Sequence, residues 1–426
     1  MRKTIRGLLR NDFIKGSALL TTTTLIANVL NYFFNVLAAR ALGPTGFGEI
    51  TAMLSYTVVL SIPMSVMSLA VINKIGSKGE NAARFAAALQ DWFFSKVRKW
   101  WFLFIPLAII IPFVPRLTNL SPVVGYALIP YVVLIFVGAF YGSVLQGLLL
   151  FFWISLINII TSSLKLSGGI LVLTAGGGIG TVIAFLLLSA IIPFVSSYII
   201  LKRRQTHKIH LTDKLNKRLT HALLNRYVIT TFFSILAITL LNNLDIIFVK
   251  KFFSPESAGI YSSWSLFAKI ILYFTGPLSL VSFIFFSDTT SKKSHERILT
   301  FSLGILTIIG IVSYIFYRYF SLFAIHILFG NKFDAVSPYM GSASMFGTFY
   351  TTITFVNNYF LAKSSNYSLM LCVLIPIYLY LVVTVPRTLG SLISLNVYFS
   401  LGVLVLYLVA YGHMFFYNGA NGKKKV

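Results

Sequence analysis

The sequence predicts an all-α polytopic membrane protein, and three observations support this fold class. Its 426 residues are 57% hydrophobic and only 11% charged, with a mean hydropathy of +0.85. Soluble domains carry about 25% charged residues. Apolar runs recur along the whole chain, and about 20 apolar residues span a bilayer as a helix. The basic residues gather mainly in alternate loops, which is typical of membrane proteins.

Twelve apolar segments are candidate transmembrane helices. In chain order they cover residues 17–39, 48–72, 100–114, 123–145, 152–174, 178–201, 227–249, 258–286, 299–320, 339–361, 368–385 and 389–416. Six of them contain a proline. Membrane helices tolerate proline, which often marks a kink where the packing changes.

The distribution of charge predicts the orientation. With the N-terminus inside, 26 of the 35 Lys and Arg residues lie on the cytoplasmic side and 7 on the outer side. This asymmetry follows the positive-inside rule, and twelve spans then place both termini in the cytoplasm. The N-terminal MRKTIRGLLRNDFIKG runs into a full-length span with no small-residue cleavage site. It therefore predicts a retained first helix rather than a signal peptide.

A repeated corner predicts two halves of like orientation. The segment RALGPTGFGEI follows the first span, and KFFSPESAGIY occupies a similar place after the seventh. Adding 211 to the numbers of Arg40, Pro44 and Gly48 gives Lys251, Pro255 and Gly259. Six spans in each half give a parallel repeat about an axis along the membrane normal. The corners themselves are interpreted as structural, since proline ends a helix or starts the next one and glycine lets two helix ends approach closely.

The expected domains are an N-terminal six-helix bundle (1–201), a basic linker (202–226) and a C-terminal six-helix bundle (227–426). The linker, KRRQTHKIHLTDKLNKRLTHALLNR, has eight basic residues and one acidic residue. A cytoplasmic segment held at an anionic membrane surface explains this composition. A regulatory or nucleic-acid-binding role is the alternative, but for the protein as a whole we expect no nucleic-acid partner.

Three stretches together resemble one family of exporters. RALGPTGFGEI after the first span, YGSVLQGLLLFF at 141–152 and LDIIFVKKFFSPESAGIYSSWSLFAKI at 244–270 are similar to polysaccharide-export flippases. That family belongs to the MATE-like superfamily of multidrug, oligosaccharidyl-lipid and polysaccharide exporters. The resemblance covers essentially the whole chain. Each motif is degenerate, so the specificity lies in their order and placement.

The resemblance implies two six-helix bundles around a V-shaped cavity that opens alternately to each side. It also implies a cargo of lipid-linked oligosaccharide, typically on polyprenyl pyrophosphate, moved from the cytoplasmic to the outer leaflet for surface polysaccharide biosynthesis. Membrane lipids, a polysaccharide polymerase and glycosyltransferases are the partners it suggests, in the cytoplasmic membrane. The chain lacks the two additional spans of some lipid II flippases, which disfavours a peptidoglycan role.

Two lysines within spans are candidate substrate-binding residues. Lys165 lies in NIITSSLKLSGGILV and Lys269 in SLFAKIILYF. An ionisable residue at membrane depth costs roughly 2.5–3.5 kcal/mol on insertion scales and usually faces a cavity. A lysine that snorkels to the headgroups is the alternative for each. Arg40 is a further substrate-binding candidate, although a cation at a helix end also anchors at the interface.

Other polar residues within spans are candidates for coupling, binding and gating. Asp245, in LLNNLDIIFV, is either the partner of a cavity lysine in a salt bridge or a proton or sodium coupling site. Asn31 belongs to a stripe with Asn28 and Asn35 that faces either a hydrated cavity or a neighbouring helix. The resemblance implies that Gln146 acts at the cytoplasmic gate.

The residues indicate neither catalysis nor a cofactor. Cys372 is the single cysteine, and we find no metal-ligand cluster, nucleophile with its base or phosphate-binding loop. A membrane polymerase or glycosyltransferase usually has a large outer loop or a cluster of acids, and this sequence has neither. A cation-coupled multidrug antiporter of the MATE type is the stronger alternative, but such transport favours several carboxylates in the membrane. We therefore expect a flippase rather than an enzyme.

Overall fold

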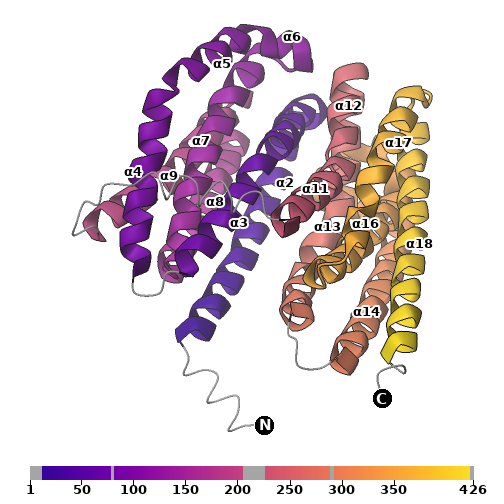
Figure 1. Ribbon diagram of the computed structural model, residues 1–426. Helices are drawn as coiled ribbons and strands as arrows, with labels where there is room; N and C mark the ends of the chain where they lie inside the picture. Colours follow the sequence, from indigo (N-terminus) through magenta and orange to yellow (C-terminus); the bar gives the residue numbers. More distant parts are fainter. Residues whose placement is uncertain (1–11, 78–80, 205–225, 288–291, 423–426) are drawn as a thin grey trace. The chain divides into compact units, whose positions relative to one another are not determined.

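The computed structural model describes residues 12–77, 81–204, 226–287 and 292–422, and every regular element among them is a helix (Figure 1). The chain divides into two compact units, Met1–Ile229 and Thr230–Val426. The basic N-terminal residues 1–11, most of the expected linker (205–225) and the C-terminal residues 423–426 lie outside the described residues. The separate linker domain therefore stays a prediction.

The first unit is a bundle of helices, and the candidate site described below lies among three of its long helices. Its helices are α2 (Asp12–Leu60), α3 (Ile62–Gly76), α4 (Ala82–Lys99), α5 (Phe104–Ile110), α6 (Val114–Thr118), α7 (Pro122–Gly147), α8 (Phe151–Ala175) and α9 (Ile179–Arg204). Helix α8 packs along α2 and α9, and α7 packs against α9 and α3.

The corner after the first span is a sharp break inside α2. Gly43 has φ 66° and ψ −175°, a backbone conformation outside the helical region. A residue with a Cβ atom is strained at this φ, which explains a glycine here. Pro44 then begins the second segment, where its missing N–H is not needed. At the second corner, Pro255 likewise begins a helix, after the extended residue Phe253.

Prolines divide the third expected span, which the sequence predicted as one segment from 100 to 114. The structure has instead two short 3-10 turns, Trp101–Leu103 and Ile111–Phe113, alternating with α5 and α6. Pro106, Pro112 and Pro115 fall in this stretch, and each removes a backbone donor from the helix. Before it, α4 packs its apolar face on α7, with the Phe93 and Phe140 rings stacked 4.0 Å apart.

The second unit is also built from α-helices, with two 3-10 helices among the described residues. They are α11 (Arg226–Leu241), α12 (Leu244–Phe252), α13 (Pro255–Ser287), α14 (Lys292–Tyr319), α15 (Ser321–Leu328), the 3-10 helix η4 (Asn331–Tyr339), α16 (Met340–Ala362), the 3-10 helix η5 (Asn366–Leu369), α17 (Met370–Thr384) and α18 (Leu389–Gly422). Helix α16 packs against α13, α14 and α18. The first residues of α11 are grouped with the first unit.

The expected span 227–249 is broken in the structure. Helices α11 and α12 meet at an angle of 42°. Asn243 stands at the break, where its side-chain amide donates to the carbonyl of Thr239 at 2.9 Å. This side-chain bond competes with the regular helical ladder, which is the usual reason that asparagine marks helix ends. As a result, Asp245 lies in the first turn of α12 rather than in the middle of a continuous helix.

Helices α13 and α16 make the tightest contact involving a glycine in the described part of the second unit. A Cβ atom added at Gly347 would lie 2.3 Å from the backbone oxygen of Ala268. One helix turn from this contact, the indole N–H of Trp264 donates to the hydroxyl of Ser342 at 3.1 Å. This packing fixes the segment of α13 that carries Lys269.

Seven of the described helices are long and apolar enough to cross a membrane, or eight if the bent pair α11–α12 counts as one span. The chain is therefore a multi-pass helical membrane protein. Fewer of the described helices meet this criterion than the twelve expected, for two reasons. Prolines divide the span expected at 100–114 into short pieces, and the Ser, Thr and Asn side chains of α16 lower its mean hydropathy. The expected total of twelve and the cytoplasmic position of both termini stay predictions.

We expect the Gly347→Ala substitution to lower the thermal unfolding midpoint of the purified protein. Because the added Cβ meets backbone rather than a flexible side chain, overpacking costs about 1–3 kcal/mol. Gly402→Ala is the matched control, since no atom of the described residues lies within 4 Å of a Cβ atom there. Equal midpoints for both variants would contradict the tight contact between α13 and α16.

Candidate functional site

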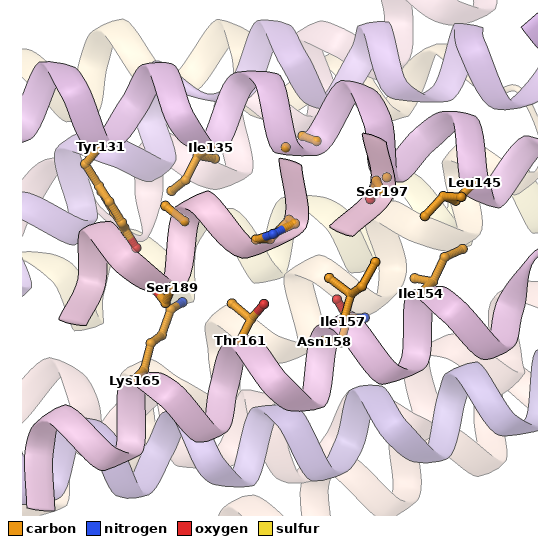
Figure 2. Close-up of a pocket in the computed structure, with 15 residues that line it drawn as sticks. Tyr131, Ile135, Leu145, Ile154, Ile157, Asn158, Thr161, Lys165, Ser189 and Ser197 are labelled. Atoms are coloured by element: carbon orange, nitrogen blue, oxygen red, sulfur yellow. The ribbon is translucent and has the colours of Figure 1, made fainter. Parts of the chain in front are cut away.

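A cavity of about 260 Å³ lies between α7, α8 and α9 of the first unit (Figure 2). Apolar and small residues form most of its wall. Six of its residues carry polar side chains: Tyr131, Asn158, Thr161, Lys165, Ser189 and Ser197. The cavity therefore combines an apolar wall with a small set of polar groups, as ligand sites in proteins generally do.

Helical spacing places these polar side chains on the faces of α8 and α9 that line the cavity. Asn158, Thr161 and Lys165 are three and four residues apart on α8, so they lie on one face of that helix. Ser189 and Ser197 lie two turns apart on α9. Helix α7 approaches α9 closely at Gly138, where a Cβ atom would be 3.2 Å from the Cβ of Pro193.

Lys165 provides the positive charge of the cavity. Its side chain is half-buried, and Figure 2 shows it extending from α8 into the cavity beside Ser189. None of the described residues that line the cavity is acidic. Among the described residues, we find no hydrogen bond or ion pair that reaches this ammonium group. A cation in a membrane-embedded cavity without a counter-charge favours an anionic ligand.

Two hydroxyl groups of the cavity are buried without a hydrogen-bond partner in the described structure, those of Thr161 and Ser197. Leaving a buried polar group unsatisfied costs about 1–3 kcal/mol. Tyr131, from α7, is 1% exposed and extends toward the same end of the cavity as Lys165. The cavity thus presents several hydrogen-bond donors whose partners the described chain does not supply.

The other site residues predicted in the first unit do not line this cavity. Asn31 donates to the carbonyl of Ala27 at 2.8 Å and to the hydroxyl of Ser162 on α8 at 3.1 Å. It therefore faces a packed neighbour, one of the two settings expected for its stripe. Arg40 is exposed, three residues before the break at Gly43, and Gln146 is half-buried at the end of α7.

A second polar cluster surrounds Asp245 in the second unit. The hydroxyl of Tyr261, on α13, donates to the Asp245 carboxylate at 2.5 Å. The amide of Asn396, on α18, donates to the same carboxylate oxygen at 3.3 Å and also contacts the Tyr261 hydroxyl. Tyr378, on α17, donates to Asn396 at 2.6 Å. Four helices therefore contribute to one buried network.

This network leaves one acceptor of the carboxylate without a partner. Asp245 is 0% exposed, and its Oδ1 atom has no hydrogen-bond partner among the described residues. The N-terminus of α12 favours a negative charge at this position. Lys269 is half-buried and interacts electrostatically with Asp245, and no hydrogen bond between the two side chains is found in the described part of the chain. Whether Lys269 binds substrate stays a prediction.

Sequence reasoning missed most of the residues in the cavity around Lys165 and in the network around Asp245. Asn158 and Thr161 share the helical face of Lys165, and this spacing could have identified them. Tyr131 and Ser189 belong to other helices, so no local pattern connects them to Lys165. In the described residues, no group of three or more His, Cys, Asp or Glu side chains could hold a metal ion.

Comparisons with solved structures identify the fold. The lipid II flippase MurJ in an inward closed conformation is 17% identical, with a TM-score of 0.69, 93% of this chain covered and 87% of that chain. An inward-facing multidrug resistance MATE transporter of the MOP superfamily is 13% identical, with a TM-score of 0.65 and coverage of 96% and 100%. At these identities the likeness establishes the fold alone.

A third structure is informative about charge. It is a MOP superfamily transporter from Pyrococcus furiosus, reported to have a binding pocket of reversed polarity that suggests a different function. It is 14% identical to this chain, with a TM-score of 0.55 and 96% of each chain covered.

A search of curated protein sequences gives no match to this chain. The family described as "Polysaccharide biosynthesis protein" matches residues 13–289, which is more than half of the sequence. This match leads to one assignment: the chain belongs to the polysaccharide biosynthesis protein family, and its fold is like that of the MurJ and MATE structures.

Proposed function

We propose that this protein is a flippase that moves lipid-linked oligosaccharide from the cytoplasmic to the outer leaflet for surface polysaccharide biosynthesis. The observation that carries the proposal is the Lys165 ammonium group, which lines a membrane-embedded cavity without an acidic neighbour in its wall. The headgroup of such a lipid is anionic, through its pyrophosphate and through any acidic sugar that it carries. A cationic cavity replaces part of the hydration that such a headgroup loses inside the membrane.

The comparisons support this proposal in two ways. Membership of a polysaccharide biosynthesis family favours an oligosaccharide cargo, and the MurJ neighbour is named as a flippase of lipid II. Reversed polarity in a related binding pocket is a precedent for a change of function within this fold. For this chain we infer twelve spans in two parallel bundles that work by alternating access. Both termini lie in the cytoplasm, and a polysaccharide polymerase and glycosyltransferases act in the same pathway.

The membrane potential supplies a driving force for this direction of transport. An inside-negative potential favours outward movement of an anion by about 2.3 kcal/mol per charge fully crossing 100 mV. Within the proposal, Lys269, Arg40 and Asn31 contribute to substrate binding, and Gln146 acts at the cytoplasmic gate. The protein carries its cargo across the membrane without changing it chemically, so we assign it no catalytic residue.

Asp245 is proposed as the coupling residue. Its carboxylate lies at the break between two half-helices, which is where transporters often bind coupling ions. The Oδ1 atom has no hydrogen-bond partner among the described residues, which leaves an acceptor for a coupling ion. A carboxylate that can bind a cation also favours the second candidate function, a cation-coupled multidrug antiporter. Several of the structural neighbours are MATE transporters, which supports the same alternative.

We expect Lys165→Ala to reduce flipping of a fluorescent polyprenyl-pyrophosphate oligosaccharide in proteoliposomes. A hydrogen bond to a charged group contributes about 1.5–3 kcal/mol, so the rate should fall roughly tenfold or more. The assay measures exposure of the labelled headgroup on the opposite leaflet, with an imposed inside-negative potential. Lys332→Ala is the matched control, since Lys332 is exposed in η4, outside the cavity.

Two results would overturn the flippase assignment. One is no transport by the wild-type protein under any imposed potential or ion gradient. The other is exchange of a cationic dye for protons or sodium by the same vesicles, which would establish the antiporter instead.

We expect Asp245→Asn to abolish the response of flipping to an ion gradient while leaving the potential-driven rate measurable. Asparagine keeps the size of the side chain and one acceptor oxygen, but it removes the charge that binds a cation. The measurement compares flipping with and without a sodium or proton gradient. A variant that responds to the gradient as strongly as the wild-type protein would exclude Asp245 as the coupling residue.

A further inference from the structure

We propose that the cavity between α7, α8 and α9 binds one sugar unit that bears a single carboxylate, with Lys165 and Tyr131 holding the carboxylate. This inference rests on the proposed function and specifies the part of the headgroup that the cavity takes. The cargo is then an oligosaccharide that contains an acidic sugar, such as a uronic acid.

The position of the donors supports a single oxyanion. Lys165 extends from α8 and Tyr131 from α7, and Figure 2 shows both side chains at the end of the cavity that holds Ser189. Three helices thus contribute polar groups to one end. Hydrogen bonds to a carboxylate from an ammonium or a hydroxyl are charge-assisted and stronger than those between neutral groups.

The charge of the cavity favours one negative charge over two. Lys165 is the only ionisable amine or guanidinium among the residues that line the cavity in the described structure. One carboxylate leaves this site neutral, whereas the pyrophosphate of the lipid carrier would leave an excess of negative charge. An uncompensated charge is unfavourable in a cavity between membrane-spanning helices. The pyrophosphate therefore belongs outside this cavity.

The size of the cavity limits the ligand to one sugar unit. Its volume of about 260 Å³ lies below the range of about 300–1,000 Å³ that is typical of pockets for drug-sized ligands. A complete oligosaccharide headgroup exceeds this volume. The remaining units of the headgroup must lie elsewhere while one acidic unit occupies the cavity.

The remainder of the wall matches a sugar ring. Thr161 and Ser197 carry the hydroxyl groups without partners, and Asn158 adds an amide. These groups can bond to ring hydroxyls, which both donate and accept. Ile135 and Ile157 provide apolar surface against which the C–H face of a pyranose packs. A purely inorganic anion would leave both the hydroxyl groups and this apolar surface unused.

The test measures binding of small soluble probes to the full-length protein in nanodiscs by ligand-observed NMR. The probes are methyl glucuronide, methyl glucoside, methyl phosphate and inorganic pyrophosphate. We expect methyl glucuronide to bind more tightly than each of the others. In Lys165→Gln its affinity should fall roughly tenfold or more, as expected for loss of a charged hydrogen bond.

Two further variants keep the test independent of folding defects in Lys165→Gln. Tyr131→Phe removes only the phenolic hydroxyl, and Thr161→Val removes a buried hydroxyl for which the described residues supply no partner. Both should weaken binding of methyl glucuronide severalfold. Ser163→Ala, on the exposed face of the same helix, is the matched control and should bind as the wild type does.

Three outcomes would overturn the inference. They are equal binding of the glucuronide and the glucoside, tighter Lys165-dependent binding of either phosphate probe, and no measurable binding of the glucuronide. None of these decides the flippase assignment, which the vesicle assay tests separately. Flipping that depends on Lys165, together with failure of glucuronide binding, would retain the proposed function and exclude the acidic sugar.

Discussion

A charge inside the hydrocarbon of a membrane needs a partner or a polar cavity, and this constraint organises both polar centres of the protein. Lys165 satisfies it by lining a cavity among three helices. Asp245 satisfies it through hydrogen bonds from Tyr261 and Asn396 and through its place at a helix N-terminus. The two solutions differ in a way that matters for transport, because the first leaves a cation available and the second leaves one carboxylate oxygen available.

Breaks in the helices create the second of these centres. Backbone groups in a membrane have to be hydrogen-bonded within the protein, so an interrupted helix persists only where side chains or neighbouring helices compensate. At Asn243 the side chain itself bonds to the preceding turn. The interruption turns the next helix by 42° and presents its first turn to the buried network. A continuous helix would place Asp245 in mid-span, away from any helix dipole end.

The fold by itself does not choose the cargo. Structures with TM-scores of 0.69 and 0.65 to this chain are named as a lipid II flippase and as a multidrug transporter. What distinguishes transporters that share an architecture is the chemistry of their sites. In this chain the cavity wall of the first unit carries a lysine and no acid, which is the polarity that an anionic headgroup needs.

The sequence by itself determined the helical membrane fold and the candidate charges, since hydropathy, loop charge and isolated ionisable residues are local properties. It marked Pro44 and Pro255 as the end of one helix or the start of the next, and it singled out Lys165 and Asp245. It did not reveal that Tyr131 and Ser189 share a cavity with Lys165, or that Asn396 and Tyr378 reach Asp245. Those contacts join helices far apart in the chain, and only packing, aided by close approaches such as Gly138 to Pro193, decides which faces meet.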